Sequence, residues 1–210
     1  YHNRGHHTNV ATPSDPATAR RNEPLYFFWI RSFIGSYLQY NVKVFETDFF
    51  TFDSLQTHDM FNVYVPYVNI NNFLLDHYNT FNYKHKNSIL VERLLKINSN
   101  SQEKEVYIHF QSNCFEIIVV KGNKLIFFNS FEYNTPEDFI YYILFTFEQL
   151  QLNPEIISVK ILGSIIKDSD FFEIAYKYIR NCDLFNSLIL PNTFGRTDEE
   201  IRNHFTLFHS

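Results

Sequence analysis

Residues 105–163 read EVYIHF QSNC FEIIVV KGNK LIFFNSFEY NTPEDFIYYILFTFEQLQLNPEIISVKILG, and this stretch decides the fold. Its β-branched and aromatic runs at 106–111, 115–120 and 125–133 predict three strands. The polar breaks between these runs are short enough for tight turns, and Gly122 supplies the positive φ that a Gly-first two-residue turn requires. We therefore expect a three-stranded antiparallel meander.

A helix should follow the meander. Thr135, Pro136 and Asp138 form a capping pattern that satisfies free backbone amides and complements the helix dipole. The helix should extend to about Leu152, because the residue that precedes Pro154 is disfavoured in the α region. The predicted helix is therefore long and rich in aromatic residues.

Strands and helices continue to alternate toward the C-terminus. Residues 158–165 predict a fourth strand, 170–180 predict an amphipathic helix, and 187–190 predict a fifth strand that ends at Pro191. A second capping pattern at 197–200 predicts a short C-terminal helix. The order βββαβαβ is shared by ribonuclease-H-like and actin-like ATPase lobes, so we expect a mixed α/β fold of this kind.

The N-terminal half gives weaker signals. Apolar spacing predicts a helix at 33–40, extended chain or a strand at 42–52, a strand at 61–66, a helix at 68–78, strand-like alternation at 80–85 and a helix at 88–97. We predict the following organisation: a disordered or non-native leader at 1–24, the remnant of a first lobe at 25–100, a second lobe at 101–192 and a C-terminal helix at 193–210.

The leader differs in kind from the remainder of the chain. It has no apolar periodicity and cannot bury enough surface to offset the entropy of ordering it. We assign its histidines, His2, His6 and His7, to this leader rather than to a metal site. Because Met60 is the only methionine, we interpret the chain as a fragment, a processed form or the product of an altered reading frame.

Composition disfavours several classes of protein. A net charge of −5, with 18 basic residues spread along the chain, disfavours nucleic-acid binding. The longest apolar run, 139–145, is too short to span a membrane. Cys114 and Cys182 are too few for a disulfide framework, so we expect a protein of the reducing cytoplasm.

Three strings in the chain point to a family. NVYVPYVNINNF at 62–73, FNSF at 128–131 and EDFIYYILFT at 137–146 resemble the bacterial domain-of-unknown-function family 3822, which has an actin-like ATPase fold. The resemblance covers roughly residues 37–183. It implies two lobes, and because residues 1–36 cannot supply the opening meander of a first lobe, we expect that lobe to be incomplete.

The resemblance to an ATPase fold directs attention to phosphate-binding turns. Such turns are rich in glycine, because only glycine lets backbone amides approach phosphate closely, and an Asp beside them organises Mg²⁺. The turn expected at 111–114 has neither, so Ser112 and Asn113 are weak candidates for a nucleotide site. Gly163 and Ser164 resemble a Gly-Gly motif that contacts adenosine, although a single glycine at a strand end more often serves packing.

Other constellations of reactive residues have weak support. A ribonuclease-H-like enzyme needs inward carboxylates that bind two metals, and we expect Glu105, Glu116 and Glu132 to face solvent. His77 and His85, with Asp76 nearby, are more typical of surface histidines than of a metal site.

A cysteine nucleophile and a serine hydrolase also have weak support. Cys114 with His109 on the neighbouring strand is a possible reactive thiol, but a half-buried structural cysteine is the simpler interpretation. Ser112 and His109 lack a carboxylate in sequence reach, so a hydrolase triad is not supported.

The residues favour a protein without catalytic activity over an enzyme. Our leading hypothesis is a bacterial binding or scaffold module with a degenerate actin-like fold, which needs no metal or cofactor. It would associate with itself or with a protein partner through the aromatic helix, at Phe139, Tyr142 and Phe145. The alternatives are an ATP-binding protein whose phosphate turn lies in a missing N-terminal region and, less favoured, a ribonuclease-H-like nuclease.

Overall fold

The computed structural model describes residues 50–55, 58–186 and 197–208. The leader at 1–24, the helix predicted at 33–40 and the strand predicted at 187–190 lie outside the described residues. The chain divides into two compact units. One contains the described residues 50–52 and 63–82, and the other contains 53–62 and the chain from Tyr83 onward. The four segments predicted from sequence stay a prediction.

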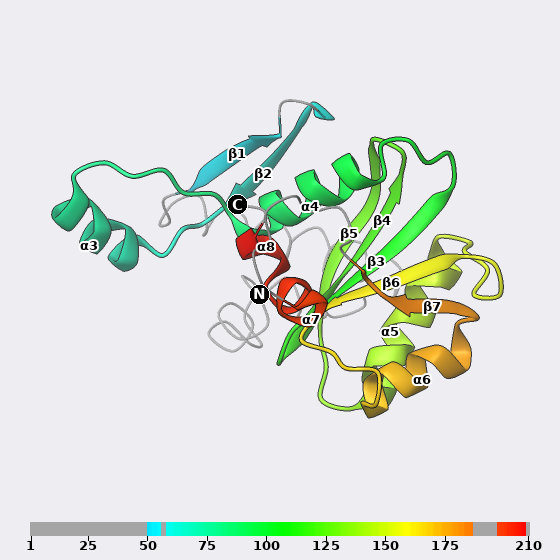
Figure 1. Cartoon of the computed structure of the whole chain (residues 1–210). Helices are drawn as coiled ribbons and strands as arrows, with labels where there is room; N and C mark the ends of the chain where they lie inside the picture. The colour runs from blue at the N-terminus through cyan, green and yellow to red at the C-terminus, as the bar shows by residue number, and fades with distance from the viewer. Residues whose placement is uncertain (1–49, 56–57, 187–196, 209–210) are drawn as a thin grey trace, which may run out of the picture. The chain divides into compact units, whose positions relative to one another are not determined.

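The second unit is built on one five-stranded sheet (Figure 1). Its strands are β3 (Lys104–Phe110), β4 (Cys114–Lys121), β5 (Lys124–Glu132), β6 (Ser158–Gly163) and β7 (Asn181–Leu184). They lie in the order β5-β4-β3-β6-β7. Because β3 pairs antiparallel with β4 and parallel with β6, the sheet is mixed and β3 is its centre. The predicted meander and the order βββαβαβ are confirmed.

The last strand of this sheet is not the one that the sequence predicts. β7 lies at Asn181–Leu184 and pairs in parallel with β6, with Cys182 opposite Val159. Asn181 and Asp183 are poor strand formers and are exposed, so the segment has little strand signal of its own. Pairing with β6 and burial of Cys182 explain why it is a strand.

Helices cover both faces of the sheet (Figure 1). They are α5 (Pro136–Gln149) and α6 (Asp170–Tyr178) on one face, and α4 (Lys86–Ile97), α7 (Asp198–Asn203) and α8 (Phe205–Phe208) on the other. Val106, Ile108 and Phe110 point into the core below α5 and α6. Tyr107, between them, points into the core below α4. Burial on both faces explains why the central strands are apolar almost throughout.

Different local interactions determine where α5 begins and where it ends. The predicted capping box is present, with the Thr135 hydroxyl accepting from the amide of Asp138. The predicted end at Leu152 is wrong, because the helix stops at Gln149. Gln151 adopts a φ of 53°, and the Leu152 amide donates to the Phe147 carbonyl at 2.8 Å, which is the hydrogen bond of a Schellman motif. The helix therefore ends before Pro154 restricts it.

The aromatic residues of α5 divide between core and surface. Phe139 is fully buried and contacts Phe115 edge-on, with ring centroids 4.7 Å apart. Tyr142 is half-buried and stacks on Phe131. The prediction that Phe139 meets a partner is therefore wrong, since its face of the helix covers the sheet. Two aromatic side chains of α5 are exposed. Phe145, which the prediction included, is 46% exposed, and Tyr141, which it omitted, is 61% exposed.

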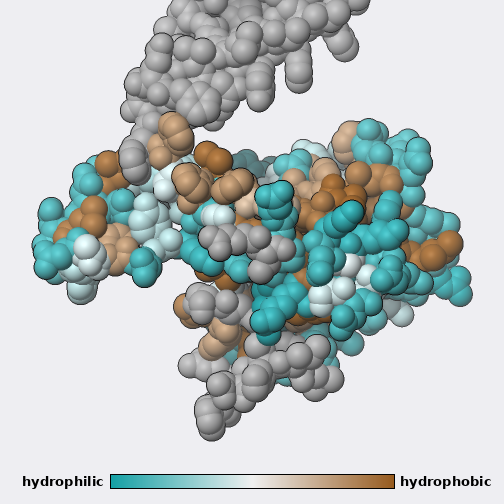
Figure 2. All heavy atoms as spheres, turned by 90° about the horizontal axis from the view of Figure 1, so that it is seen from above, coloured by the Kyte–Doolittle hydropathy of each residue, from teal (hydrophilic) through white to brown (hydrophobic). Residues whose placement is uncertain are grey.

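The first unit contains α3 (Val68–Tyr78), in agreement with the predicted helix at 68–78. None of its residues is buried, and Ile70 and Phe73 are each 58% exposed. Apolar and hydrophilic residues are accordingly mixed over α3, at the left of Figure 2. The helix therefore presents an amphipathic surface that no described residue covers.

A small hairpin precedes α4. Its strands are β1 (Thr51–Leu55) and β2 (Met60–Tyr64), which form a two-stranded sheet. The strand-like alternation predicted at 80–85 is wrong, because these residues form no strand. His85 instead caps α4, where its side chain accepts a hydrogen bond from the amide of Asn87. Within the part of the chain that the structure describes, no helix is both long and apolar enough to cross a membrane.

Candidate functional site

Buried polar side chains gather where the first turn of α4 meets the sheet. Asp53 is 9% exposed, and its Oδ2 atom accepts from the His85 amide at 2.7 Å and from the Ser88 hydroxyl at 2.6 Å. The Asn62 amide group in turn donates to the Ser88 hydroxyl at 2.9 Å. Asp53 and Ser88 therefore join the hairpin of β1 and β2 to the start of α4.

A second group of polar residues surrounds Glu116 on β4. Glu116 is 1% exposed and lies opposite His109 of β3, whose Nδ1 atom is 3.0 Å from Glu116 Oε2. The Lys86 ammonium donates to Glu116 Oε1 at 3.0 Å, and the Gln111 amide donates to both carboxylate oxygens at 2.7 Å. The carboxylate is therefore fully occupied by donors from β3, the following turn and α4.

Burial alone raises the pKa of Glu116, since it penalises the charged form, but the hydrogen bond and charge of His109 and of Lys86 outweigh it. The net pKa is below the ordinary value. The pKa of neighbouring His85 is also lowered, by burial and by the positive charge of Lys86. Together these effects keep Glu116 ionised and favour the neutral form of His85.

Because Glu116 is paired, the stability of the fold should depend on pH in the acidic range. A carboxylate whose pKa is depressed by folding contributes stability above its unfolded pKa, about 4.3, and loses it as pH falls through the folded value. We expect the free energy of unfolding to decrease as the pH is lowered below about 4.3. Urea unfolding between pH 7 and 3 measures this dependence.

Two variants isolate the contribution of Glu116. Glu116→Gln should flatten the acid dependence and lower stability at pH 7 by about 1–3 kcal/mol, because it weakens charge-assisted hydrogen bonds. Glu132→Gln is the matched control, since Glu132 is on the neighbouring strand and exposed. An equal loss of acid dependence in both variants would contradict the assignment to Glu116.

The buried Glu116 corrects a prediction. Of the three carboxylates expected to face solvent, Glu132 is exposed, Glu105 is partly exposed and held by Lys160 at 2.7 Å, and Glu116 is buried. The apolar run on both sides of Glu116 was the signal for a strand that is covered on both faces. His109 places its Nδ1 atom 3.0 Å from Glu116 Oε2, and Cys114 is half-buried, so the pairing of Cys114 with His109 as a reactive thiol stays a prediction.

The predicted nucleotide-site residues fall at one end of the sheet. Ser112 and Asn113 are exposed in the turn that follows β3, and Gly163 and Ser164 lie at the end of β6, which pairs in parallel with β3. The turn is closed by the Gln111 amide, which donates to the Cys114 carbonyl at 3.0 Å. The Tyr133 hydroxyl also donates to the Gln111 carbonyl.

Gly163 is required by the approach of β6 to β3. It has a φ of +96°, and a Cβ atom there would lie 2.0 Å from the Phe110 carbonyl oxygen. The next amide, that of Ser164, donates to the same carbonyl at 3.0 Å. Close packing against Phe110 is therefore sufficient to explain why residue 163 is a glycine.

The remaining candidates show no metal-binding geometry. His77 places Nδ1 2.7 Å from the Phe73 carbonyl of its own helix. Across the described ranges, no three His, Cys, Asp or Glu side chains are placed to hold a metal ion. Cys182 is buried, and burial, with the charge of Asp183, raises its pKa to about 12, so its thiol is protonated.

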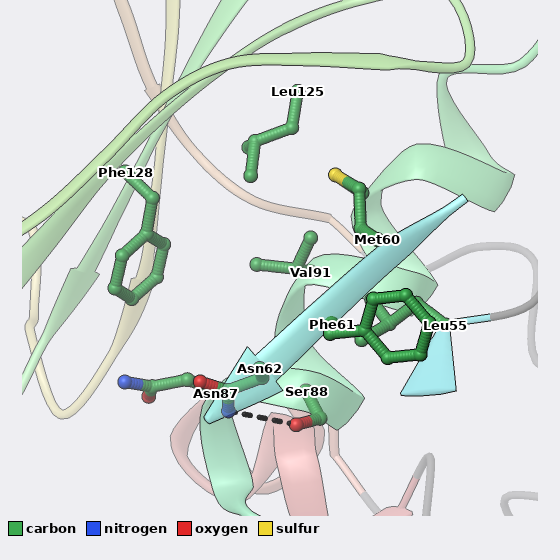
Figure 3. Close-up of a pocket in the computed structure, with 9 residues that line it drawn as sticks. All are labelled: Leu55, Met60, Phe61, Asn62, Asn87, Ser88, Val91, Leu125 and Phe128. Carbon is green, nitrogen blue, oxygen red and sulfur yellow. Dashed lines mark hydrogen bonds between the residues drawn. The ribbon is translucent and has the colours of Figure 1, made fainter. Parts of the chain in front are cut away.

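Sequence reasoning did not predict a pocket, which opens beside α4 (Figure 3). It has a volume of about 140 Å³. Its apolar wall consists of Leu55, Met60, Phe61, Val91, Leu125 and Phe128. Asn62, Asn87 and Ser88 add polar groups, which gather at the end of the pocket away from Leu125 (Figure 3). The pocket is thus an apolar recess with one polar end.

The fold of the second unit, a five-stranded mixed sheet with helices on both faces, matches that of a solved actin-like structure. A Bacteroides thetaiotaomicron protein, described as having an actin-like ATPase fold and unknown function, superposes with a TM-score of 0.63. It is 17% identical, and the match covers 82% of this chain and 65% of that chain. At this identity the likeness shows the fold, and this chain spans just under two thirds of that structure.

The family follows from the sequence match. The model of the family "Protein of unknown function (DUF3822)" matches residues 27–182. The chain therefore belongs to this family, as the strings at 62–73, 128–131 and 137–146 predict.

A separate, short similarity links the chain to two enzymes. Alkane 1-monooxygenase of Ectopseudomonas oleovorans is 53% identical over 38 residues, which are 18% of this chain and 10% of the enzyme. Alkane 1-monooxygenase 1 of Alcanivorax borkumensis is 53% identical over 36 residues, 17% of this chain and 9% of the enzyme. The chain thus spans about a tenth of these curated relatives.

Proposed function

We propose that this chain is a non-catalytic binding module built on an actin-like fold. The observation that carries the proposal is the closed network around Glu116. Its carboxylate lies beside the turn where an actin-like ATPase would hold phosphate, yet His109, Lys86 and Gln111 already occupy it. A group bound in this way cannot also organise Mg²⁺ without leaving its partners unpaired.

The electrostatics of the turn also oppose a phosphate. A buried, ionised carboxylate repels an anion, and the nearest cation in the network, Lys86, is bonded to that carboxylate. The turn contains no glycine, so its backbone amides cannot approach a phosphate as closely as those of a glycine-rich turn. The balance of charge therefore favours a lobe that does not bind ATP through this turn.

One observation favours the alternative of a nucleotide-binding protein. Ser112, Asn113, Gly163 and Ser164 lie at the same end of neighbouring strands, as an adenosine and phosphate site would require. In that case ATP would need a second turn from a region outside the described residues. The nuclease hypothesis has less support, because the inward Glu116 is bonded to three partners.

The two functions differ in their response to nucleotide. We expect the melting temperature to be unchanged by Mg-ATP, because the phosphate turn is closed. A protein that bound ATP would gain about 2.7 kcal/mol at 100 times Kd. Differential scanning fluorimetry with and without millimolar Mg-ATP tests the difference, with Mg²⁺ and ADP alone as controls. A shift that Ser112→Ala and Asn113→Ala abolish together would establish the alternative.

A binding module needs a contact surface, and we place one on α5. Tyr141 and Phe145 stack with ring centroids 6.1 Å apart and are exposed. Exposed aromatic pairs are enriched where proteins meet other proteins. The partner would be a protein or a second copy of this chain. Because Cys114 and Cys182 are both free thiols, we place the protein in the reducing cytoplasm.

A further inference from the structure

A buried arginine on α7 lacks an acidic partner. α7 lies beside β6 (Figure 1), and Arg202 is only 8% exposed there. Its Nη2 atom donates to the Ile165 carbonyl at 3.5 Å, and its Nε atom is buried without a hydrogen-bond partner. Within the described residues, this one long hydrogen bond is the only polar interaction of the guanidinium. Arginine is rarely buried unless a charge pairs with it, so an anion is missing from this site.

The surroundings of Arg202 make an unpaired charge costly. Its neighbour Ile201 is buried, and so is Phe205, one turn along the chain. An arginine keeps its charge in a folded protein, so the cost of burial cannot be avoided by loss of a proton. Electrostatic attraction is stronger in such surroundings than in water. An anion that pairs with the guanidinium would therefore bind more tightly than it would to an exposed arginine.

The outer atoms of the guanidinium remain open to a ligand. Nε is sealed from solvent, so it cannot be the contact atom. Nη1 also makes no hydrogen bond within the described residues, but it is not sealed as Nε is, so it retains accessible surface. Nη2 uses one N–H group for Ile165, which leaves one on Nη2 and two on Nη1. These donors form the planar fork that matches the oxygens of a carboxylate.

We propose that Arg202 binds a carboxylate, carried either by a small free acid or by an acidic side chain of a protein partner. One negative charge balances the one unpaired positive charge. Asp198, Glu199 and Glu200 are exposed in the first turn of the same helix and would repel the second charge of a phosphate. The site does not involve the turn at 111–114, so the proposal is independent of whether that turn binds nucleotide.

Acetate is the simplest probe of this site. The melting temperature should be measured at neutral pH while sodium acetate replaces sodium chloride at constant total salt. We expect it to rise with acetate and to saturate, because a ligand that binds only the folded state stabilises it by mass action. General salt effects do not saturate and act on every variant alike. The saturable rise that depends on Arg202 therefore measures binding.

Three variants test the role of the guanidinium. Arg202→Met should weaken acetate binding at least about 10-fold, the loss expected for a charged hydrogen bond. It should not lower the melting temperature in chloride, because it removes an unpaired buried charge. Arg202→Lys retains the charge but not the fork, so it should weaken binding less than Arg202→Met. Arg180→Met is the matched control and should bind acetate normally, since Arg180 is exposed and paired with Glu155.

Two peptides distinguish the possible sources of the carboxylate. A saturable response to acetyl-Gly-Glu-Gly-amide, but not to acetyl-Gly-Gln-Gly-amide, would identify an acidic side chain, and a response to acetate alone would identify a small free acid. The proposal is overturned if acetate and chloride give the same melting temperature, or if the acetate response persists in a folded Arg202→Met variant. It is also overturned if Arg202→Met is less stable in chloride, or if inorganic phosphate gives the tighter Arg202-dependent response.

Discussion

Replacement of Gly163 by alanine should destabilise the protein by about 4 kcal/mol or more, among the largest effects of a single substitution. The added Cβ atom would lie 2.0 Å from the carbonyl oxygen of Phe110, and this oxygen belongs to a backbone that cannot turn away. The φ of +96° adds strain of its own. β6 would have to move away from β3, which would break the parallel pairing at the centre of the sheet.

Gly122 provides the matched control. It also has a positive φ, +56°, but a Cβ atom there would lie 3.2 Å from its nearest neighbour, the Ser101 carbonyl. Gly122→Ala should cost only about 1–2 kcal/mol, the price of a left-handed conformation. Urea unfolding of both variants gives the comparison. Equal losses would show that conformation, and not the approach of β6 to Phe110, dominates at Gly163.

The second large effect should come from Phe139→Ala. Phe139 is fully buried and packs edge-on against Phe110, Phe115 and Phe171. Removing a ring from such a site costs about 3–5 kcal/mol, because it combines lost transfer free energy with a cavity. Chemical denaturation followed by circular dichroism measures the loss.

Phe145→Ala tests the other side of the same helix. Phe145 is 46% exposed, so its loss should change stability by less than about 1 kcal/mol. If α5 carries the contact surface, this variant should instead weaken association, measured by sedimentation at several protein concentrations. A Phe145→Ala variant that loses as much stability as Phe139→Ala would contradict the division between core and surface.

Local patterns predicted most of the second unit. The three strands of the meander, the turn at Gly122 and the capping box at Thr135 depend on residues close in sequence, so one segment contains the whole signal. The sequence did not predict the helix end at Gln149. Schellman motifs usually have glycine in the left-handed position, but here that position is Gln151, so the sequence contains no glycine that would indicate the end.

The candidate site depends on packing between distant segments, and the sequence predicted less of it. Whether Glu116 faces water or a second layer is decided by α4, which covers that face of the sheet. Its partners Lys86 and His109 come from two other elements. The pocket likewise needs β1, β2, α4 and β5 together, and no single segment encodes it. The nucleotide role of Ser112, Asn113, Gly163 and Ser164 stays a prediction.

The central position of β3 sets an order of events in folding. β4 pairs with β3, and β5 with β4, through tight turns, whereas β6 reaches β3 only after β4, β5 and α5 have been passed in the sequence. Closing such a long loop costs more entropy than closing a hairpin, so the pairing of β6 with β3 should form late. Contacts that form late act mainly on the rate of unfolding. Gly163 should therefore determine how long the folded protein lasts more than how quickly it forms.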